Sequence, residues 1–482
     1  MSYLERSGVK SSGVSVNRLI KGGVNSLKKI LNNNDFSNEL YYNRHLQEYF
    51  CREEIITQLI SYICGIEVST EQLQNNATRV LCNNLPKIKD YLFEKNDFLT
   101  VLIETIDSEN TNTLSCIIKV IDELLVSSNS TMFQIIVEQE LPIDELMKCL
   151  DIDEVYSLLN DLLRYKEQEQ FVGIEWLSKQ CFIDKLLNVF IQQGNYGDDY
   201  DEVMIYNVTL LFQTISIIKC VSINLQFNTN ELIKPFYKTI FTSTSKGFVQ
   251  NGLDIILSML KGCTNDQIII EPEFVPICLN ELITYSDYIT HHLKYNNGNI
   301  TTERIQLIGI VQSMINSRYQ SILQFIIQKQ WIDYCINTFY SYEHVSTIYR
   351  QTILDILNSI FQENGIECLG LELLKNGLIQ RMIKEDEKSE EYYKIHHCYF
   401  DCHIFNVYLM NNLYLLSTKN KPTKCGQLIS KNNSFINYFE TIVEKREQDL
   451  PIEYFVSKEI DPFKMPDGYA EDMDYDDDDL YM

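Results

Sequence analysis

Apolar residues recur along most of this chain with the period of an α-helix. In Ile55–Ile63 they occur at i, i+1, i+4, i+5 and i+8, so they share one helical face, as in a helix packed on a core. The same spacing returns in Val155–Leu163, Ile305–Ile315 and Val345–Phe361. We find no sustained alternation of apolar and polar residues between hairpin turns, so a β-rich fold is disfavoured.

The expected helices are separated by short polar breaks, such as Ser127–Ser130 and Lys166–Glu169. Such breaks suit antiparallel neighbours, and helix pairs then recur at roughly 35 to 45 residues, the spacing of HEAT or armadillo repeats. The pattern predicts an all-α fold, a curved solenoid of stacked antiparallel helices. No repeated residue motif accompanies the spacing. An irregular globular bundle is the alternative, although one core rarely grows to this length.

Three regions follow from the composition along the chain. Residues 1–23, rich in Ser, Gly and Lys, predict a flexible N-terminal segment, and 24–450 the helical-repeat domain. The acidic residues of 451–482 predict a disordered tail, because dense like charges resist packing. Within the repeat domain, Gln193–Asp201 and Glu385–Glu391 are expected to form solvated loops between helices.

Charge and composition narrow the class of partner. The 482 residues include 67 acidic and 41 basic side chains, giving a net charge of -26, which disfavours binding to nucleic acid or to anionic membranes. The opening Met1–Lys10 has no apolar core of signal-peptide length, so we expect a cytoplasmic or nuclear protein. The 14 cysteines are scattered through apolar segments, as reduced thiols would be. The most apolar run, Ile205–Ile218, is too short and too polar to span a bilayer.

No segment carries a recognisable catalytic or cofactor motif. Gly8 and Gly13 have the spacing of a phosphate-binding loop, but the lysine that such a loop needs is missing. Gly197–Asp201 resembles one metal motif of metallophosphatases, without the second ligand cluster that two metals require. His396–His403 contains three histidines and two cysteines, of which Cys398 and Cys402 would share a helical face near His403, and we interpret it as a helix start with partly buried side chains. We therefore expect no catalytic residues, no metal and no cofactor.

Without a catalytic or cofactor motif, the expected function is protein binding, because a helical solenoid offers an extended surface for contact with other proteins. The two tryptophans, Trp176 and Trp331, are expected to be core or groove residues. The sequence thus predicts a non-enzymatic scaffold.

Several segments, in order, make the chain similar to the SAPS-domain family, the regulatory subunits of the 2A-type serine/threonine phosphatase called protein phosphatase 6. The resemblance runs from about residue 20 to 445 and rests mostly on apolar helix patterns. Its most specific part is a leucine-rich helix followed at a set distance by Trp176. The matching segments are Arg79–Ile88, Ser115–Leu125, Val155–Leu163, Glu175–Leu187, Asn251–Leu257, Thr302–Ile308 and Trp331–Leu357.

The resemblance implies that the chain binds the catalytic subunit of protein phosphatase 6, directs its activity, and could hold a further adaptor subunit. Leu159, Leu163 and Trp176 are the candidate contact residues. The chain departs from the family at Asp161, where a basic residue is usual, and in ending with a short acidic tail in place of a long charged region. The alternative is a helical-repeat adaptor for transport or tethering, unrelated to phosphatases.

Overall fold

The computed structural model describes the chain between residues 16 and 443, and it divides the chain into two compact units, Met1–Trp331 (unit 1) and Ile332–Met482 (unit 2). The predicted acidic tail 451–482 lies outside the described residues. Also outside them are 34–35, 84–85, 96, 108, 128–129, 219, 221, 224–225, 228–229, 264–274, 295–299, 341–345, 363–364, 397–399, 401 and 420–422.

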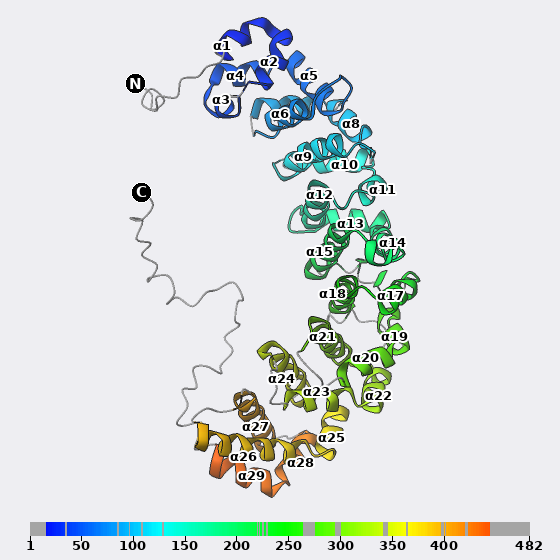
Figure 1. Ribbon diagram of the computed structural model, residues 1–482, viewed down its shortest axis with the longest axis vertical. Coiled ribbons are helices and arrows are strands. Elements are labelled where there is room, and N and C mark those ends of the chain that lie inside the picture. The colour runs from blue at the N-terminus through cyan, green and yellow to red at the C-terminus, as the bar shows by residue number, and fades with distance from the viewer. Residues whose placement is uncertain are drawn as a thin grey trace, which may run out of the picture. The chain divides into compact units, whose positions relative to one another are not determined.

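Unit 1 is built from helices joined by short turns (Figure 1). They are α1 (Val16–Leu19), η2 (Ile20–Ser26), α2 (Leu27–Leu31), α3 (Phe36–Tyr42), α4 (Arg44–Phe50), α5 (Glu53–Ile63), α6 (Glu71–Leu81), α7 (Pro86–Glu94), α8 (Asp97–Glu104), α9 (Thr111–Ser127), α10 (Thr131–Glu138), α11 (Ile143–Met147), α12 (Asp153–Arg164), α13 (Val172–Lys179), α14 (Phe182–Gly194), η3 (Gly197–Asp199), α15 (Glu202–Ile218), α17 (Ile233–Thr242), α18 (Lys246–Cys263), α19 (Ile277–Thr284), α20 (Ser286–Lys294), α21 (Thr302–Asn316) and α22 (Gln320–Lys329).

Unit 2 is also helical in its described part. The two units divide after Trp331, the first residue of α23 (Trp331–Phe339). The remaining helices of unit 2 come after α23. They are α24 (Thr347–Phe361), α25 (Glu367–Lys375), α26 (Leu378–His396), α27 (His403–Thr418), α28 (Lys424–Ser430), α29 (Asn433–Tyr438) and the π-helical turn η4 (Phe439–Val443).

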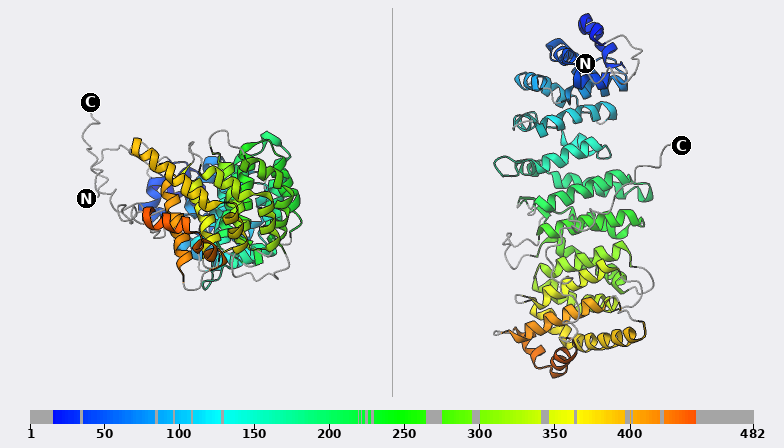
Figure 2. Two further views of the ribbon diagram at one scale, coloured as in Figure 1. Left: turned by 90° about the horizontal axis from the view of Figure 1, so that it is seen from below. Right: turned by 90° about the vertical axis from the view of Figure 1, so that its left-hand side faces the viewer.

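The helices of unit 1 stack in two rows. In the first row, α6, α9, α12, α15, α18 and α21 each contact the next helix of the row. The second row includes α14, α17, α19 and α22, and contacts such as α14 with α15 and α17 with α18 join the rows. Figure 2 shows these helices as successive layers. The predicted all-α, HEAT- or armadillo-like stack of antiparallel helices is confirmed.

Each layer is held by an apolar face of the kind that the sequence predicts. In α12, Val155, Leu158, Leu159, Leu162 and Leu163 have no exposed surface. Burial of one such side chain stabilises the fold by about 1.5–3 kcal/mol. First-row helices recur every 40 to 56 residues, from Glu71 of α6 to Thr302 of α21. The interval therefore reaches beyond the predicted 35 to 45, because some connections are longer.

Polar side chains connect successive first-row helices. The hydroxyl of Ser157 donates to Asp122 Oδ2 at 2.8 Å, and that of Thr214 donates to Asn160 Oδ1 at 3.0 Å. Further along the row, Thr209 donates to Asn251 Oδ1 at 3.2 Å. Buried polar groups need such partners, so these bonds fix how one helix sits on the next.

Two of the predicted loop segments are wrong at least in part. The chain is already helical from Val16, within the predicted lead-in 1–23. Glu385–Glu391 lies inside α26, where Glu385, Asp386 and Ser389 are buried. Its charges were expected to keep it in solvent, but Glu385 pairs with Lys388 of the same helix, and Asp386 has partners on α27 and α29. Gln193–Asp201 does connect two helices, α14 and α15, as predicted.

Among the helices that the structure describes, none is long and apolar enough to cross a membrane. The apolar run Ile205–Ile218 forms most of α15, whose neighbours are α12, α14 and α18.

Candidate protein-binding surface

Three open cavities form one trough along α6, α9 and α12. The first, of about 170 Å³, includes Arg79, Lys119 and Glu154. The second, of about 340 Å³, shares Lys119 and Glu154 with it. The third, of about 620 Å³, shares Val126 with the second. We call this continuous depression the trough, and all of it lies within unit 1.

The middle of the trough is acidic. The charged residues of α9 and α12 are five carboxylates, Asp122, Glu123, Asp153, Glu154 and Asp161, and two cations, Lys119 and Arg164. Lys119 Nζ lies 3.9 Å from Glu154 Oε1. Lys89 Nζ of α7 lies 3.9 Å from Glu123 Oε1 as well. The five carboxylates still outnumber these three cations, so this part of the trough favours a positively charged ligand.

Asp122 and Asp161 face each other between α9 and α12. Burial raises the pKa of Asp122 to about 6; the charge of Asp161 raises it further, and the hydrogen bond from Ser157 opposes both. Burial also raises the pKa of Asp161, against the attraction of Arg164. Two carboxyls thus share a half-buried position with Arg164 as the cation that acts on Asp161, and a further cation placed there would favour their ionised forms.

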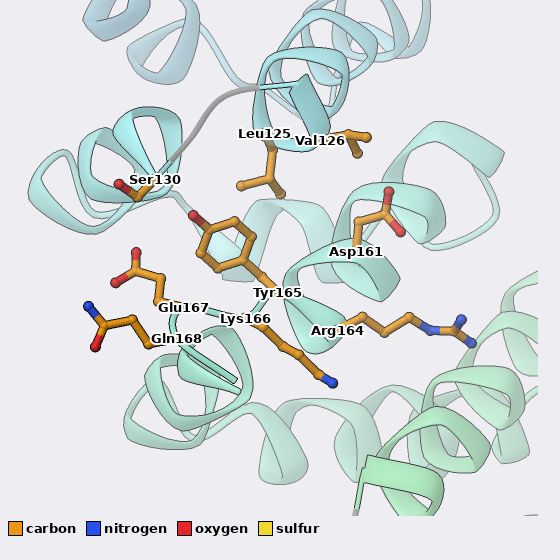
Figure 3. A pocket seen from close by; sticks show the side chains of 9 residues that line it. All are labelled: Leu125, Val126, Ser130, Asp161, Arg164, Tyr165, Lys166, Glu167 and Gln168. Carbon is orange, nitrogen blue, oxygen red and sulfur yellow. The ribbon is translucent and has the colours of Figure 1, made fainter. Parts of the chain in front are cut away.

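An aromatic cluster supports the third cavity. Tyr165 stacks on Phe133 with ring centroids 4.5 Å apart, and Phe133 meets Trp176 edge to face at 6.3 Å. Figure 3 shows the Tyr165 side chain pointing toward Ser130 in this cavity, with Asp161 on the neighbouring turn of α12. The rigid aromatic group holds the end of α12 in place.

The three predicted contact residues lie in the core. Leu159 and Leu163 have no exposed surface, and Trp176 is 9% exposed. Leu159 and Leu163 lie in α12, of which other residues line the trough, whereas Trp176 lies in α13, which contributes no lining residue. Asp161, which the sequence marks as a departure from the SAPS pattern, does line it. The sequence analysis did not predict Asp122 and Val126, which line the trough. The feature that could have indicated them is a polar or exposed position on an otherwise apolar helix.

The thiols near the trough are poor nucleophiles. Cys82 and Cys116 line its first cavity. Burial raises the pKa of Cys82 to about 12 and also raises that of Cys116, so both stay protonated at neutral pH. In the described residues, no group of three or more His, Cys, Asp and Glu side chains could hold a metal. From the predicted His396–His403 cluster, Cys402 and His403 are buried, whereas His397 and Cys398 lie outside the described residues.

Gly173 allows α13 to pack tightly against the end of α12. A Cβ at this position would lie 1.8 Å from the carbonyl oxygen of Leu162, which is backbone and cannot move aside. We expect Gly173→Ala to lower the free energy of unfolding by about 1–3 kcal/mol or more, because overpacking forces the helices apart. Urea unfolding followed by circular dichroism measures this change.

Gly309→Ala is the matched control, since Gly309 also lies within a helix but faces only the side chain of Leu257, at 3.1 Å. The decrease in the free energy of unfolding should be smaller for Gly309→Ala, because alanine favours the helix by about 1 kcal/mol over glycine and the Leu257 side chain can shift. Equal losses in the two variants would contradict the proposed role of the Gly173 contact.

No protein-family model matches this chain, and no curated protein matches it. Among solved structures, the chain is similar to one from a study of the interaction between cadherin and β-catenin, with 13% identity, 82% of this chain and 72% of that chain covered, and a TM-score of 0.42. It is also similar to an engineered protein, with 11% identity, 90% of this chain and 98% of that chain covered, and a TM-score of 0.46. For SYS-1 the identity is 9%, the coverage is 91% of this chain and 82% of that chain, and the TM-score is 0.40. At these values the likenesses identify no partner or activity.

Proposed function

We propose that this chain is a non-catalytic scaffold that binds another protein along the first row of unit 1. The observation that carries the proposal is the trough across α6, α9 and α12, an open depression lined by charged and apolar side chains of successive helices. Such a surface suits an extended contact with a protein, because neighbouring repeats each add part of it.

The partner that we propose is the catalytic subunit of a 2A-type serine/threonine phosphatase, protein phosphatase 6. Support comes from the resemblance of the sequence to the SAPS-domain family. The segments that carry it include α9, α12 and the α13–α14 pair, which form the middle of unit 1. In this role the chain binds the catalytic subunit and directs its activity, while the catalytic subunit carries out the phosphatase reaction.

Affinity purification of the tagged full-length chain from its own cells, followed by mass spectrometry, tests this proposal. The expected result is a phosphatase catalytic subunit in stoichiometric amount, and mixing the two purified proteins should shift both to an earlier elution volume in size-exclusion chromatography. Recovery of transport or tethering factors without a phosphatase would overturn the proposed partner. Recovery of no stoichiometric protein would overturn the scaffold as well.

A further inference from the structure

The α15 helix presents an apolar side to solvent. Val203, Tyr206 and Ile217 are 48%, 56% and 73% exposed, and Leu210 is partly exposed. Positions 203, 206, 210 and 217 share one helical face, and by a rise of 1.5 Å per residue they extend over about 21 Å. Gln213 lies on this face between Leu210 and Ile217. Single exposed apolar residues are ordinary, but several on one face of a helix, as in this stripe, mark an interaction site.

This stripe faces the same way as the trough. On one flank, Thr214 of α15 bonds to Asn160 of α12, and on the other, Thr209 bonds to Asn251 of α18. The second-row helix α14 contacts α15 from behind. The remaining side of α15 therefore continues the exposed surface of the first row, next to α12, as the order of these helices in Figure 1 shows.

The surface thus joins two kinds of chemistry. The α15 stripe is apolar, and the adjoining part of the trough holds the Asp122–Asp161 pair, with five carboxylates against two cations on α9 and α12. We infer that the exposed side of α9, α12 and α15 binds a protein segment in which apolar side chains are followed by lysine or arginine. This inference rests on the proposed function, since it specifies which kind of protein segment the scaffold takes.

Charge complementarity selects this occupant over others. Arg164 is the cation that acts on Asp161, and none in the described structure acts on Asp122, so a lysine or arginine of the partner placed beside the two carboxyls favours their ionised forms. Nucleic acid and anionic lipid carry the wrong sign. The acidic stretch Glu471–Asp479 of the chain itself carries the wrong sign as well.

The test uses the full-length chain and two fluorescent synthetic peptides of about 15 residues, the length of a short helical recognition segment. One peptide has leucines at helical spacing followed by three arginines, and the other has glutamates in place of the arginines. Fluorescence anisotropy should show binding of the arginine peptide, weakened at least tenfold by Asp122→Asn with Asp161→Asn. The glutamate peptide should not bind.

Matched controls separate a specific site from general charge attraction. Glu104→Gln with Glu138→Gln removes the same charge from exposed positions on α8 and α10, and it should leave the affinity within twofold. For the apolar half, Tyr206→Ser with Ile217→Ser should weaken binding at least fivefold. Its control, Ile66→Ser with Val68→Ser, changes residues that are 65% and 94% exposed elsewhere and should have little effect.

Equal weakening by the site variants and their controls would overturn the inference, as would equal binding of the two peptides. Light scattering provides a second check: a doubled mass that Ile217→Ser abolishes would show that α15 pairs with a second copy of the chain instead. The proposed function fails separately, when wild-type chain recovers no stoichiometric protein from cells. If both site variants still recover the cellular partner in full, the scaffold stands and this surface is not its contact.

Discussion

Asp386→Ala is expected to lower the free energy of unfolding by about 3 kcal/mol, the cost of removing a buried charged acceptor from its partners. Asp386 has no exposed surface, although it lies in the most charge-dense segment of unit 2. Its Oδ1 lies 3.2 Å from His403 Nδ1, and its Oδ2 accepts a hydrogen bond of 2.7 Å from the Tyr438 hydroxyl. The carboxylate thus connects α26 with α27 and α29, and alanine removes both the acceptor of the Tyr438 hydroxyl and the oxygen that lies beside His403.

Urea unfolding monitored by circular dichroism measures the loss, with Glu387→Ala as the matched control. Glu387 is the next residue of the same helix and is exposed, so its substitution should change the free energy of unfolding by no more than about 0.5 kcal/mol. A loss in Asp386→Ala no larger than in the control would show that the buried contacts contribute nothing to stability.

The same residue explains why the sequence misled us about Glu385–Glu391. Leu378, Ile379 and Met382 are buried and start a helical face that Asp386 and Ser389 continue. Periodicity counts apolar residues only, so a buried carboxylate breaks the pattern. Its partner Tyr438 is 52 residues away, and such pairing becomes visible only in three dimensions.

Elsewhere, periodicity predicted the fold well. The stripe expected in Val155–Leu163 is the buried face of α12, and the polar breaks after Ser127 and Arg164 fall at the ends of helices. The spacing of apolar residues and polar breaks was sufficient to predict the fold because the helices repeat one simple arrangement. In it, each helix needs only a suitable apolar face and a short connection.

The proposed binding surface was harder to predict than the fold. Leu159 and Leu163 were predicted as contacts from the resemblance to the SAPS-domain family, but these apolar side chains are completely buried. An apolar stripe does not by itself distinguish a core from an interface. The Asp122–Asp161 pair joins α9 to α12 across the stack, and the exposed side of α15 is defined by which of its flanks touch α12 and α18.

Trp331→Ala is the second large effect that we expect, with a loss of about 3–5 kcal/mol in the free energy of unfolding, as for other buried aromatic side chains cut to alanine. Trp331 has no exposed surface and is the first residue of α23. Its indole meets Phe325 edge to face with ring centroids 5.6 Å apart, and its Nε1 donates a hydrogen bond of 2.7 Å to Thr290 Oγ1. The side chain therefore joins α20, α22 and α23 through both packing and a polar bond.

Trp331→Phe separates these two contributions. Phenylalanine retains most of the ring contact but lacks the N–H donor. Trp331→Phe should therefore lower the free energy of unfolding by about 1–2 kcal/mol, because the hydrogen bond is lost and the ring is smaller. Unfolding is best followed by far-ultraviolet circular dichroism, because the substitution removes one of the two tryptophans of the chain. Equal losses in the two variants would assign the effect to the bond with Thr290. A loss below about 1 kcal/mol in Trp331→Ala would mean that the surrounding helices close the cavity, since the cost of such a substitution depends on how far the site can collapse.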